Sequence, residues 1–241
     1  IATGTGLGLY FEYFPVNHLP VALLICALAT WLASAFVPDI GTPMRQPQSQ
    51  SFLTILRRRP VWLFFVAHFL LQLSHAPYYT FYSIYLEDHG YSRSDIGWLW
   101  GLGVMAEVVL FALMHRVLPA VGEHRLMLWS LAFAALRWLM IGFGVDYPAI
   151  IWTAQLLHAA SFATFHAAAM TLIYRHFGDG SQGQGQAVYS MLWGTGVALG
   201  AWMVGMVWSV QMASLIFSMA SGLCLIALLL LLQPIRWVSW R

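Results

Sequence analysis

Apolar stretches of about 20 residues recur along almost the whole chain, and they constrain its fold more than any motif does. A helix needs about 20 mostly apolar residues to cross roughly 30 Å of hydrocarbon at about 1.5 Å per residue. Only 8% of the residues are charged and 60% are hydrophobic, whereas an ordinary soluble domain has roughly 25% charged residues. The sequence therefore predicts an all-α membrane protein with about seven transmembrane helices. The expected spans are residues 19–37, 60–86, 96–114, 126–144, 149–174, 187–208 and 212–232.

The distribution of polar residues divides the chain into four parts. Residues 1–37 contain a Gly-rich segment, which we expect to be the end of an earlier span, and then one complete span. Residues 38–59 are rich in Pro, Gln and Ser, a composition typical of a flexible linker. Residues 60–232 contain six spans with short loops, which predicts a six-helix domain, and residues 233–241 form a tail. Because the chain begins in apolar sequence without a Met, we expect another part of the protein to precede it.

Arginine is distributed unevenly between the two sides of the predicted membrane domain. All eleven basic residues are arginine, and nine of them fall in the linker, in alternate loops and in the tail, which lie on one side. Arg93 falls on the other side. Because an excess of arginine marks the cytoplasmic side, we expect the linker and the C-terminal tail to be cytoplasmic. The net charge of +2 is too small and too dispersed to indicate a nucleic-acid partner.

Two short sequences occur twice in the six-helix domain, in the same order. Residues 72–76 (QLSHA) match residues 155–159 (QLLHA), and residues 99–104 (LWGLGV) match residues 192–197 (LWGTGV). Equivalent positions are three spans apart, and an odd number of spans reverses the direction of the chain. The pattern predicts two inverted three-helix repeats, which are common in secondary transporters. Chance similarity between apolar helices is the alternative.

Two charged residues, Glu107 and Arg137, lie deep within predicted spans. Glu107 is the twelfth residue from the outer end of its span, and Arg137 is the twelfth from the inner end of its own, so each lies roughly 16 Å deep. Charges inside a membrane are costly and usually face a partner or a cavity. We expect the two to form a buried pair or to point into one cavity. Such a pair would either couple transport to protons, since a neighbouring charge controls the protonation of a carboxyl, or lock the helices together.

Histidines and other polar or aromatic residues form one stripe on each of two predicted spans. Their spacing places the members of each stripe on one helical face. We expect both stripes to line a substrate-binding cavity, and simple packing is the alternative for each single histidine. If Glu107 does not carry the proton, His158 is the next candidate. The stripes consist of His68, Gln72, His75, Tyr79 and Tyr82 in one span, and of Gln155, His158, Phe162 and His166 in the other.

No residue pattern indicates a metal or a cofactor. The sequence contains no HExxH motif, no Cys/His cluster and no CxxCH motif. Cys26 and Cys224 both fall in apolar runs, so we expect small buried residues rather than a disulfide. An enzyme would need a dense site of nucleophile, base or metal ligands at one depth, and the spans contain none.

Two further features predict local packing. Gly196 and Gly200 have the GxxxG spacing that permits close contact between helices. Pro77 follows His75 closely and cannot donate a backbone hydrogen bond, so we expect a bend in the helix there.

The sequence resembles the major facilitator superfamily and, within it, the phenylpropionate permease family. The resemblance rests on residues 75–86 (HAPYYTFYSIYL), 90–92 (GYS), 96–107 and 157–167. It covers essentially the whole chain and implies the end of helix 5, helix 6, the central loop and helices 7 to 12 of the superfamily fold. The basic motif that usually joins helices 8 and 9 is degraded here to residues 115–125.

The resemblance implies a secondary active transporter of the bacterial cytoplasmic membrane. We expect proton-coupled symport of a small organic solute, either an aromatic acid such as phenylpropionate or a nucleoside-like compound. The expected partners are the substrate, protons, the lipid bilayer and the N-terminal six-helix half of the same protein. A facilitator or a proton-antiport exporter of the same fold is the main alternative, and a membrane-embedded enzyme or sensor is a further one.

Overall fold

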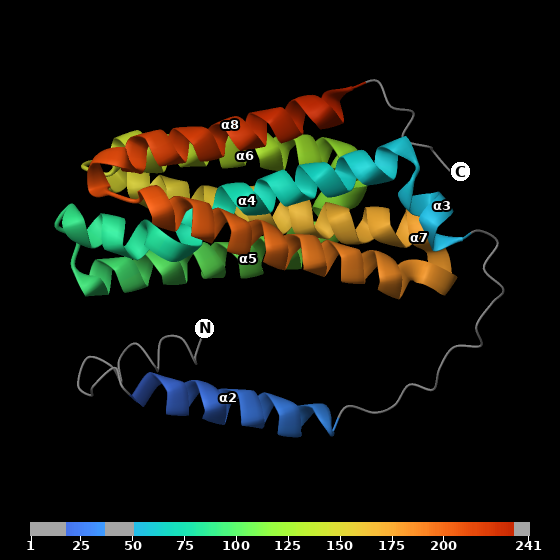
Figure 1. Ribbon diagram of the computed structural model, residues 1–241, viewed down its shortest axis with the longest axis horizontal. Helices are drawn as coiled ribbons and strands as arrows, with labels where there is room; N and C mark the ends of the chain where they lie inside the picture. The colour runs from blue at the N-terminus through green and yellow to red at the C-terminus, as the bar shows by residue number, and fades with distance from the viewer. Residues whose placement is uncertain (1–17, 37–50, 234–241) are drawn as a thin grey trace. The chain divides into compact units, whose positions relative to one another are not determined.

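The computed structural model describes residues 18–36 and 51–233, and every regular element in these ranges is a helix (Figure 1). The chain divides into two compact units, Ile1–Gln46 and Pro47–Arg241. In the first unit, α2 (Leu19–Ser34) has Pro20 in its first turn, where the missing N–H of proline leaves no helical bond unmade. Most apolar side chains of α2 are exposed, as Leu24 and Trp31 illustrate.

The second unit is a bundle of long helices. It contains α3 (Phe52–Leu56), α4 (Arg59–Asp88), α5 (Arg93–Val121), α6 (Glu123–Gly144), α7 (Pro148–Val207), the short 3-10 helix η2 (Val210–Met212) and α8 (Ala213–Leu232). α7 consists of two segments, Pro148–Gly178 and Ser181–Val207, because Gly178 has non-helical dihedral angles (φ 60°, ψ −173°). A positive φ favours glycine, so the residue type permits the break at this point.

Within residues 18–36 and 51–233, five helices are long and apolar enough to cross a membrane: α5, α6, the two segments of α7, and α8 together with η2. α4 is outside this set although it has 30 residues, because it carries the polar and aromatic stripe. Figure 1 shows α4 lying alongside α7 and α8, and it packs against both. α2 has 16 residues, which is short for a span. The predicted all-α membrane fold is thus confirmed, and five of the expected spans meet this length and composition among the described residues.

All six helices predicted between residues 60 and 232 are present. The largest differences in their ends are at α5, which extends to Val121, and at the second segment of α7, which begins at Ser181. Within the predicted linker, Phe52–Leu56 form α3, and Ile55 is buried. The Gly-rich segment, most of the linker and the tail after Gln233 lie outside the described residues.

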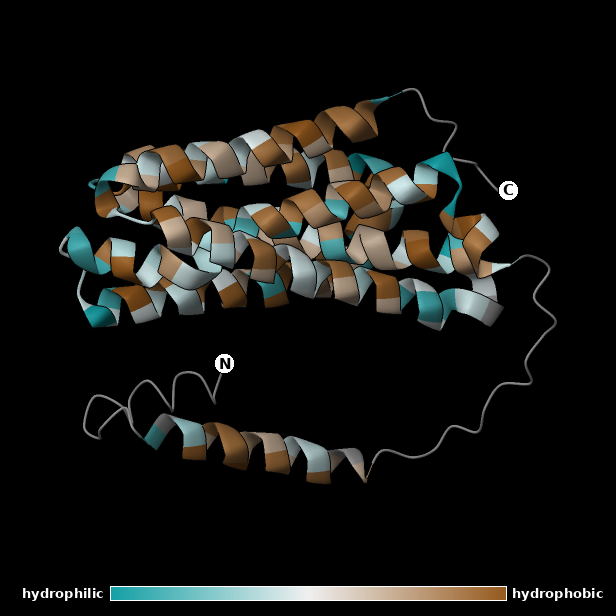
Figure 2. Cartoon of the chain, viewed as in Figure 1, coloured by the Kyte–Doolittle hydropathy of each residue, from teal (hydrophilic) through white to brown (hydrophobic). Residues whose placement is uncertain are grey.

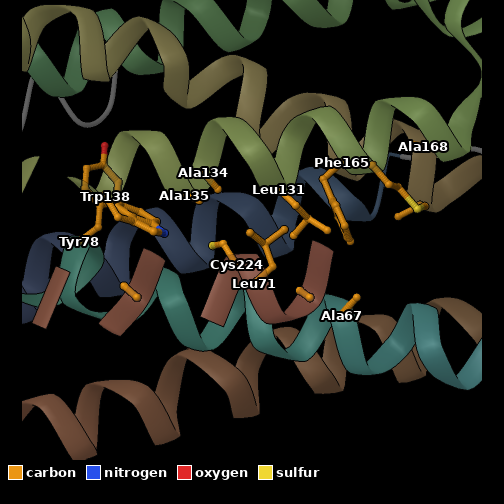
Figure 3. Packing of buried hydrophobic residues seen from close by; sticks show 14 of the residues in the cluster. Ala67, Leu71, Tyr78, Leu131, Ala134, Ala135, Trp138, Phe165, Ala168 and Cys224 are labelled. Atoms are coloured by element: carbon orange, nitrogen blue, oxygen red, sulfur yellow. The ribbon is translucent and has the colours of Figure 1, made fainter. Parts of the chain in front are cut away.

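α7 occupies the centre of the helix packing. It packs against α4, α5 and α6, while α8 packs against α4 and α6. Figure 3 shows side chains from several of these helices meeting in one core, among them Leu71, Leu131, Trp138 and Phe165. These residues come from α4, α6 and α7, so the core joins helices that are distant in sequence.

The bundle exposes a large apolar surface. Figure 2 shows hydrophobic residues along the outside of the helices, and large side chains such as Val109, Met206 and Leu229 are more than half exposed. An apolar surface of this extent is typical of a membrane protein, in which lipid replaces water as the solvent.

The two helices that carry the repeated QLxHA sequence run antiparallel. Tyr78 of α4 bonds to Gln155 of α7, the ring of His75 lies near that of His158, and Phe64 stacks with Phe165. Residue numbers fall along α4 as they rise along α7, which is the direction expected for inverted repeats.

The repeated glycines make equivalent contacts in both halves of the bundle. A Cβ on Gly103 would lie 3.3 Å from Oε1 of Gln155, and a Cβ on Gly196 would lie 2.9 Å from Cβ of Gln72. In the repeat, Gly103 is equivalent to Gly196 and Gln155 to Gln72. The second helix of each half therefore packs on the first helix of the other half, as a twofold relation between the halves requires.

Gly196 and Gly200 allow the second segment of α7 to approach α4 closely, which confirms the role predicted for the GxxxG spacing. A Cβ on Gly200 would lie 2.5 Å from Cβ of Ala76 and 2.8 Å from the carbonyl oxygen of Leu73. Pro77 lies inside α4 and has no N–H, so this carbonyl lacks the helical donor it would normally have four residues later. The carbonyl freed by Pro77 thus lies against a glycine of the neighbouring helix.

Replacing Gly200 with alanine is expected to lower the free energy of unfolding by about 1–3 kcal/mol, because the added methyl group meets atoms of α4 that cannot move aside freely. Gly194→Ala in the same helix is the matched control, since a Cβ there meets nothing within 4 Å. Alanine is also the better helix former, so the control should be as stable as the parent or slightly more stable. Reversible unfolding in mixed detergent micelles measures both, and equal stability of the two variants would contradict the described contact.

Candidate functional site

Glu107 and His158 meet in the middle of the bundle. Glu107 lies halfway along α5, about 21 Å from either end. Its Oε1 is 2.5 Å from Nε2 of His158 on α7, and the two side chains are 16% and 7% exposed. Gly103 lies one turn before Glu107, and its lack of a side chain leaves room for Gln155 and His158. Close packing of α5 on α7 therefore places the carboxyl on the imidazole.

Arg137 is completely buried on α6. Its Nε donates a hydrogen bond of 3.1 Å to the carbonyl of Ala154. Its guanidinium carbon lies 4.0 Å from the centre of the Tyr78 ring and 4.6 Å from that of Trp138. Within the described residues, neither Nη1 nor Nη2 has a hydrogen-bond partner. The two rings stabilise the cation by cation–π contacts, but both terminal nitrogens are left unpaired.

Glu107 does not pair directly with Arg137, contrary to the first form of the sequence prediction. Arg137 lies about 10 Å from the Gly144 end of α6, whereas Glu107 is about 21 Å from the matching end of α5, so the two are not at equal depth. Both residues contact the first segment of α7 instead. Arg137 bonds to Ala154 and Glu107 to His158, and these two residues are one turn apart. The charges of Glu107 and Arg137 still interact electrostatically over a longer distance.

Tyr78 connects the surroundings of Arg137 to the polar stripe of α7. Its hydroxyl donates to Oε1 of Gln155 at 3.0 Å, and its ring centre is 4.9 Å from that of Tyr82. Gln155 and Tyr82 are both completely buried. Among the residues that the structure describes, Nε2 of Gln155 and the hydroxyl of Tyr82 have no hydrogen-bond partner.

The ring of His75 lies near both Trp138, the residue after Arg137, and His158, the partner of Glu107. Its Nδ1 bonds to the carbonyl of Leu71 at 2.8 Å, and its ring centre is 4.9 Å from that of Trp138 and 6.3 Å from that of His158. His75 and His158 are both buried. The structure therefore brings these two histidines together in the interior of the bundle.

The remaining predicted stripe residues gather around His75 or around Tyr189. Tyr79 stacks with His75, and Phe162 stacks with both His158 and His166. His68 stacks on Tyr189 with ring centres 3.9 Å apart, and the Tyr189 hydroxyl is 3.0 Å from Nδ1 of His166.

Gln72 is buried beside Gly196, and its Oε1 has no partner in the described part of the chain. The stripes thus form two connected groups rather than one continuous line.

The chemistry of the two repeats differs where their packing agrees. Gly200 is the equivalent of Glu107, and it lies against the turn of α4 that carries His75, the equivalent of His158. One half places a carboxyl on its histidine, and the other places a glycine beside it. Accordingly, Nε2 of His75 has no hydrogen-bond partner within the described ranges, whereas Nε2 of His158 has Glu107.

Sequence reasoning missed Tyr78, Trp138 and Tyr189. An aromatic residue directly after a membrane-buried arginine was a usable signal for Trp138, because such a ring can stabilise the cation. Tyr78 belongs to the aromatic run after His75 but lies one residue away from the predicted stripe. Tyr189 carried no signal, since it lies outside both stripes.

A surface cavity of about 320 Å³ is present at the end of the bundle where α4 ends and α5 begins. The cavity is lined by His89, Gly90, Tyr91, Asp95, Asp146, Pro148 and Trp152, and it does not include Glu107 or His158.

Among the described residues, no group of three or more His, Cys, Asp or Glu side chains is placed to hold a metal ion.

Comparison with known proteins decides the family. The model of the MFS_1 like family matches residues 1–219. The chain belongs to the MFS_1-like family. This MFS_1-like chain is also 33% identical over 185 residues to the "Probable 3-phenylpropionic acid transporter" of Escherichia coli (strain K12). The match covers 73% of the chain and 48% of that relative, so the chain spans about half of the relative's length. No solved structure matches the chain significantly.

Membership of the MFS_1-like family confirms the resemblance to the major facilitator superfamily. The family and the relative are those of membrane transporters rather than of enzymes. The comparisons therefore agree with the helical membrane fold of the structure.

If Glu107 and His158 interact as described, a double-mutant cycle of Glu107→Gln and His158→Gln in the MFS_1-like chain should give a coupling energy of about 1–3 kcal/mol, as is typical of side chains in contact. The exposed pair Glu87–Arg93, at 3.3 Å, is the matched control and should couple by less than about 1 kcal/mol. Reversible unfolding in mixed micelles gives all the values needed. Independent, additive effects at Glu107 and His158 would exclude a direct interaction.

Proposed function

We propose that the protein is a proton-coupled symporter of a small organic solute, and that Glu107 and His158 form its proton-binding site. The observation that supports this most directly is the 2.5 Å contact between the carboxyl and the imidazole halfway along an apolar helix. Each group changes its charge by one when it binds a proton, and ionisable groups at this depth normally belong to an ion or substrate path.

Arg137 is proposed to control when this site holds its proton. The guanidinium interacts electrostatically with both Glu107 and His158, and among the described residues it forms no ion pair with Glu107. Because the interaction energy of two charges depends on their separation, a movement of α6 relative to α5 and α7 changes the proton affinity of the pair. Alternating access supplies such movements, since it shifts helices around a central site.

The solute is proposed to bind on the aromatic surface formed by Tyr79, Phe162, His166 and Trp193. The rings of Phe162 and His166 are nearly parallel, at 9°, and Trp193 meets Phe162 edge-on at 5.2 Å. Tyr79, Phe162 and His166 are all partly exposed, so they are accessible to a ligand. Flat aromatic compounds suit such a surface. The relative's name refers to an aromatic acid, and we propose the same class of substrate here.

We further propose that the six helices from α4 to α8 are the C-terminal half of a major facilitator protein of the bacterial inner membrane. In this arrangement the N-terminal half supplies the opposite wall of the cavity, residues 38–59 form a cytoplasmic linker, and the C-terminus is cytoplasmic. The excess of arginine at one end of the helices supports this orientation.

In Glu107→Gln, the complete protein should still exchange labelled 3-phenylpropionate across vesicle membranes but should fail to accumulate it against a gradient. Glutamine keeps the shape of the protonated acid and its hydrogen bonding, so binding and exchange need no proton release. Accumulation requires the return of an empty, deprotonated carrier, which glutamine cannot provide. We expect uphill uptake to fall by at least about tenfold, measured beside exchange in the same vesicles.

The exposed carboxylate Glu87, which pairs with Arg93, provides the control Glu87→Gln, and this variant should accumulate substrate normally. A parallel loss of exchange and accumulation in Glu107→Gln would indicate structural damage instead. Normal accumulation would remove Glu107 from the mechanism and leave His158 as the next candidate. Efflux driven by an imposed inward proton gradient would show an exporter rather than a symporter.

A further inference from the structure

Four buried hydrogen-bond donors without partners lie around Tyr78. They are Nη1 and Nη2 of Arg137, Nε2 of Gln155 and the hydroxyl of Tyr82, and none has a partner among the residues described. The guanidinium lies over the Tyr78 ring, Gln155 accepts from the Tyr78 hydroxyl, and the Tyr82 ring packs against that of Tyr78. All three donor side chains are at most 1% exposed. This donor cluster comes from three different helices, α4, α6 and α7.

The three residues of the donor cluster also lie at the same depth. Tyr82 is about 9 Å from the end of α4 at Asp88, while Arg137 and Gln155 are each about 10 Å from Gly144 and Pro148. These three helix ends belong to the same end of the bundle, because α4 leads to α5 there and α6 leads to α7. The donors therefore form a layer across the bundle rather than a line along one helix.

Unpaired donors in an apolar interior are strongly unfavourable, and an unpaired charge is more so. Among the described residues, no carboxylate lies within 4.0 Å of Arg137. Glu107, the partner expected from the sequence, has His158 as its partner instead. The cluster contains one formal positive charge, and the free groups of Arg137 and Gln155 can only donate. An acceptor with negative charge would satisfy all of these groups at once.

The shape of the free groups selects among anions. Tyr78 and Trp138 lie against the guanidinium by cation–π contacts, while the N–H donors of a guanidinium lie in its plane. Two N–H groups of one guanidinium match the two oxygens of a carboxylate in a bidentate pair. Gln155 and Tyr82 would add one donor each to the remaining lone pairs.

We propose that Arg137, Gln155 and Tyr82 form a carboxylate-binding site, in which Arg137 holds the acid group of an organic substrate. This inference rests on the proposed function in one respect, since it takes the carboxylate to be that of the transported solute. Neutralisation of Arg137 by the bound acid also changes the electrostatic field at Glu107, whose partner His158 lies one turn of α7 from Ala154, the residue that Arg137 contacts. Substrate binding and proton binding would thus be linked through a single guanidinium.

Binding measured without any gradient tests the site in the complete protein, held in lipid nanodiscs. The probes are 3-phenylpropionate and its neutral amide, which share a ring and a chain and differ in charge. The parent protein should bind the acid at least about tenfold more tightly than the amide, because charged hydrogen bonds contribute more than neutral ones. Tyr82→Phe should weaken binding of the acid by about tenfold, and Arg137→Lys by about tenfold to a hundredfold, with little change for the amide.

Matched controls separate the site from general effects. Arg93→Lys changes an exposed arginine whose side chain is 84% exposed, and Tyr147→Phe removes the hydroxyl of a tyrosine that is 64% exposed. Neither should alter the preference for the acid. Tyr82→Phe keeps the ring and carries no change in charge, so it retains the fold if Arg137→Lys does not.

An equal affinity for acid and amide in the parent protein would overturn the carboxylate site, as would an unchanged preference in both variants. Displacement of the acid by chloride at equal concentration would also overturn it, since the cluster would then accept any small anion. The two proposals can fail separately. Selective acid binding without proton-driven uptake would reject the symport mechanism alone, whereas proton-driven uptake with no preference for the acid would reject this site alone.

Discussion

The packing of α4 against the first segment of α7 is the interaction on which the rest of the bundle depends. In lipid, helices gain little from burying apolar surface, so close approach and interhelical hydrogen bonds have to hold them together. Both helices carry a stripe of polar and aromatic residues that would be unfavourable in hydrocarbon. Facing each other, the stripes place Gln72, His75, Gln155 and His158 in a buried interior. α5, α6 and α8 then pack around this pair and bring Glu107 and Arg137 to it.

Periodicity and composition predicted much of this arrangement, and they failed where a contact depends on more than one helix. The spans and the two stripes could be predicted because a helical face is a property of local spacing. The partner of Glu107 could not, since it depends on the lengths of α5 and α6 and on α7 bonding to both residues. The sequence estimate counted the two depths from opposite ends of the spans, whereas from matching ends Glu107 is about 21 Å deep in α5 and Arg137 about 10 Å deep in α6. Tyr189 was missed because its contact with His166 arises only when the second segment of α7 folds back.

The repeats show how a symmetric scaffold can carry asymmetric chemistry. Gly103 and Gly196 make matching contacts with Gln155 and Gln72, so close packing is shared by both halves. At the next turn, one half has Glu107 and the other has Gly200. The first contacts a histidine through a carboxyl, and the second allows a backbone to come close. Proton chemistry on one side and tight packing on the other are therefore alternative uses of the same position in the repeat.

The carbonyl of Leu73 has a mechanical consequence. Since Pro77 cannot donate to it, a change of bend in α4 at this turn breaks no hydrogen bond between residues 73 and 77. Gly200 lies against the same oxygen. Because glycine has no side chain, no side chain of the second segment of α7 blocks a sliding movement along α4 at this point. His75 is located between Leu73 and Pro77. The histidine without a carboxyl partner thus lies on a turn of α4 that proline interrupts, while the one that holds Glu107 lies on a helix free of proline after its first turn.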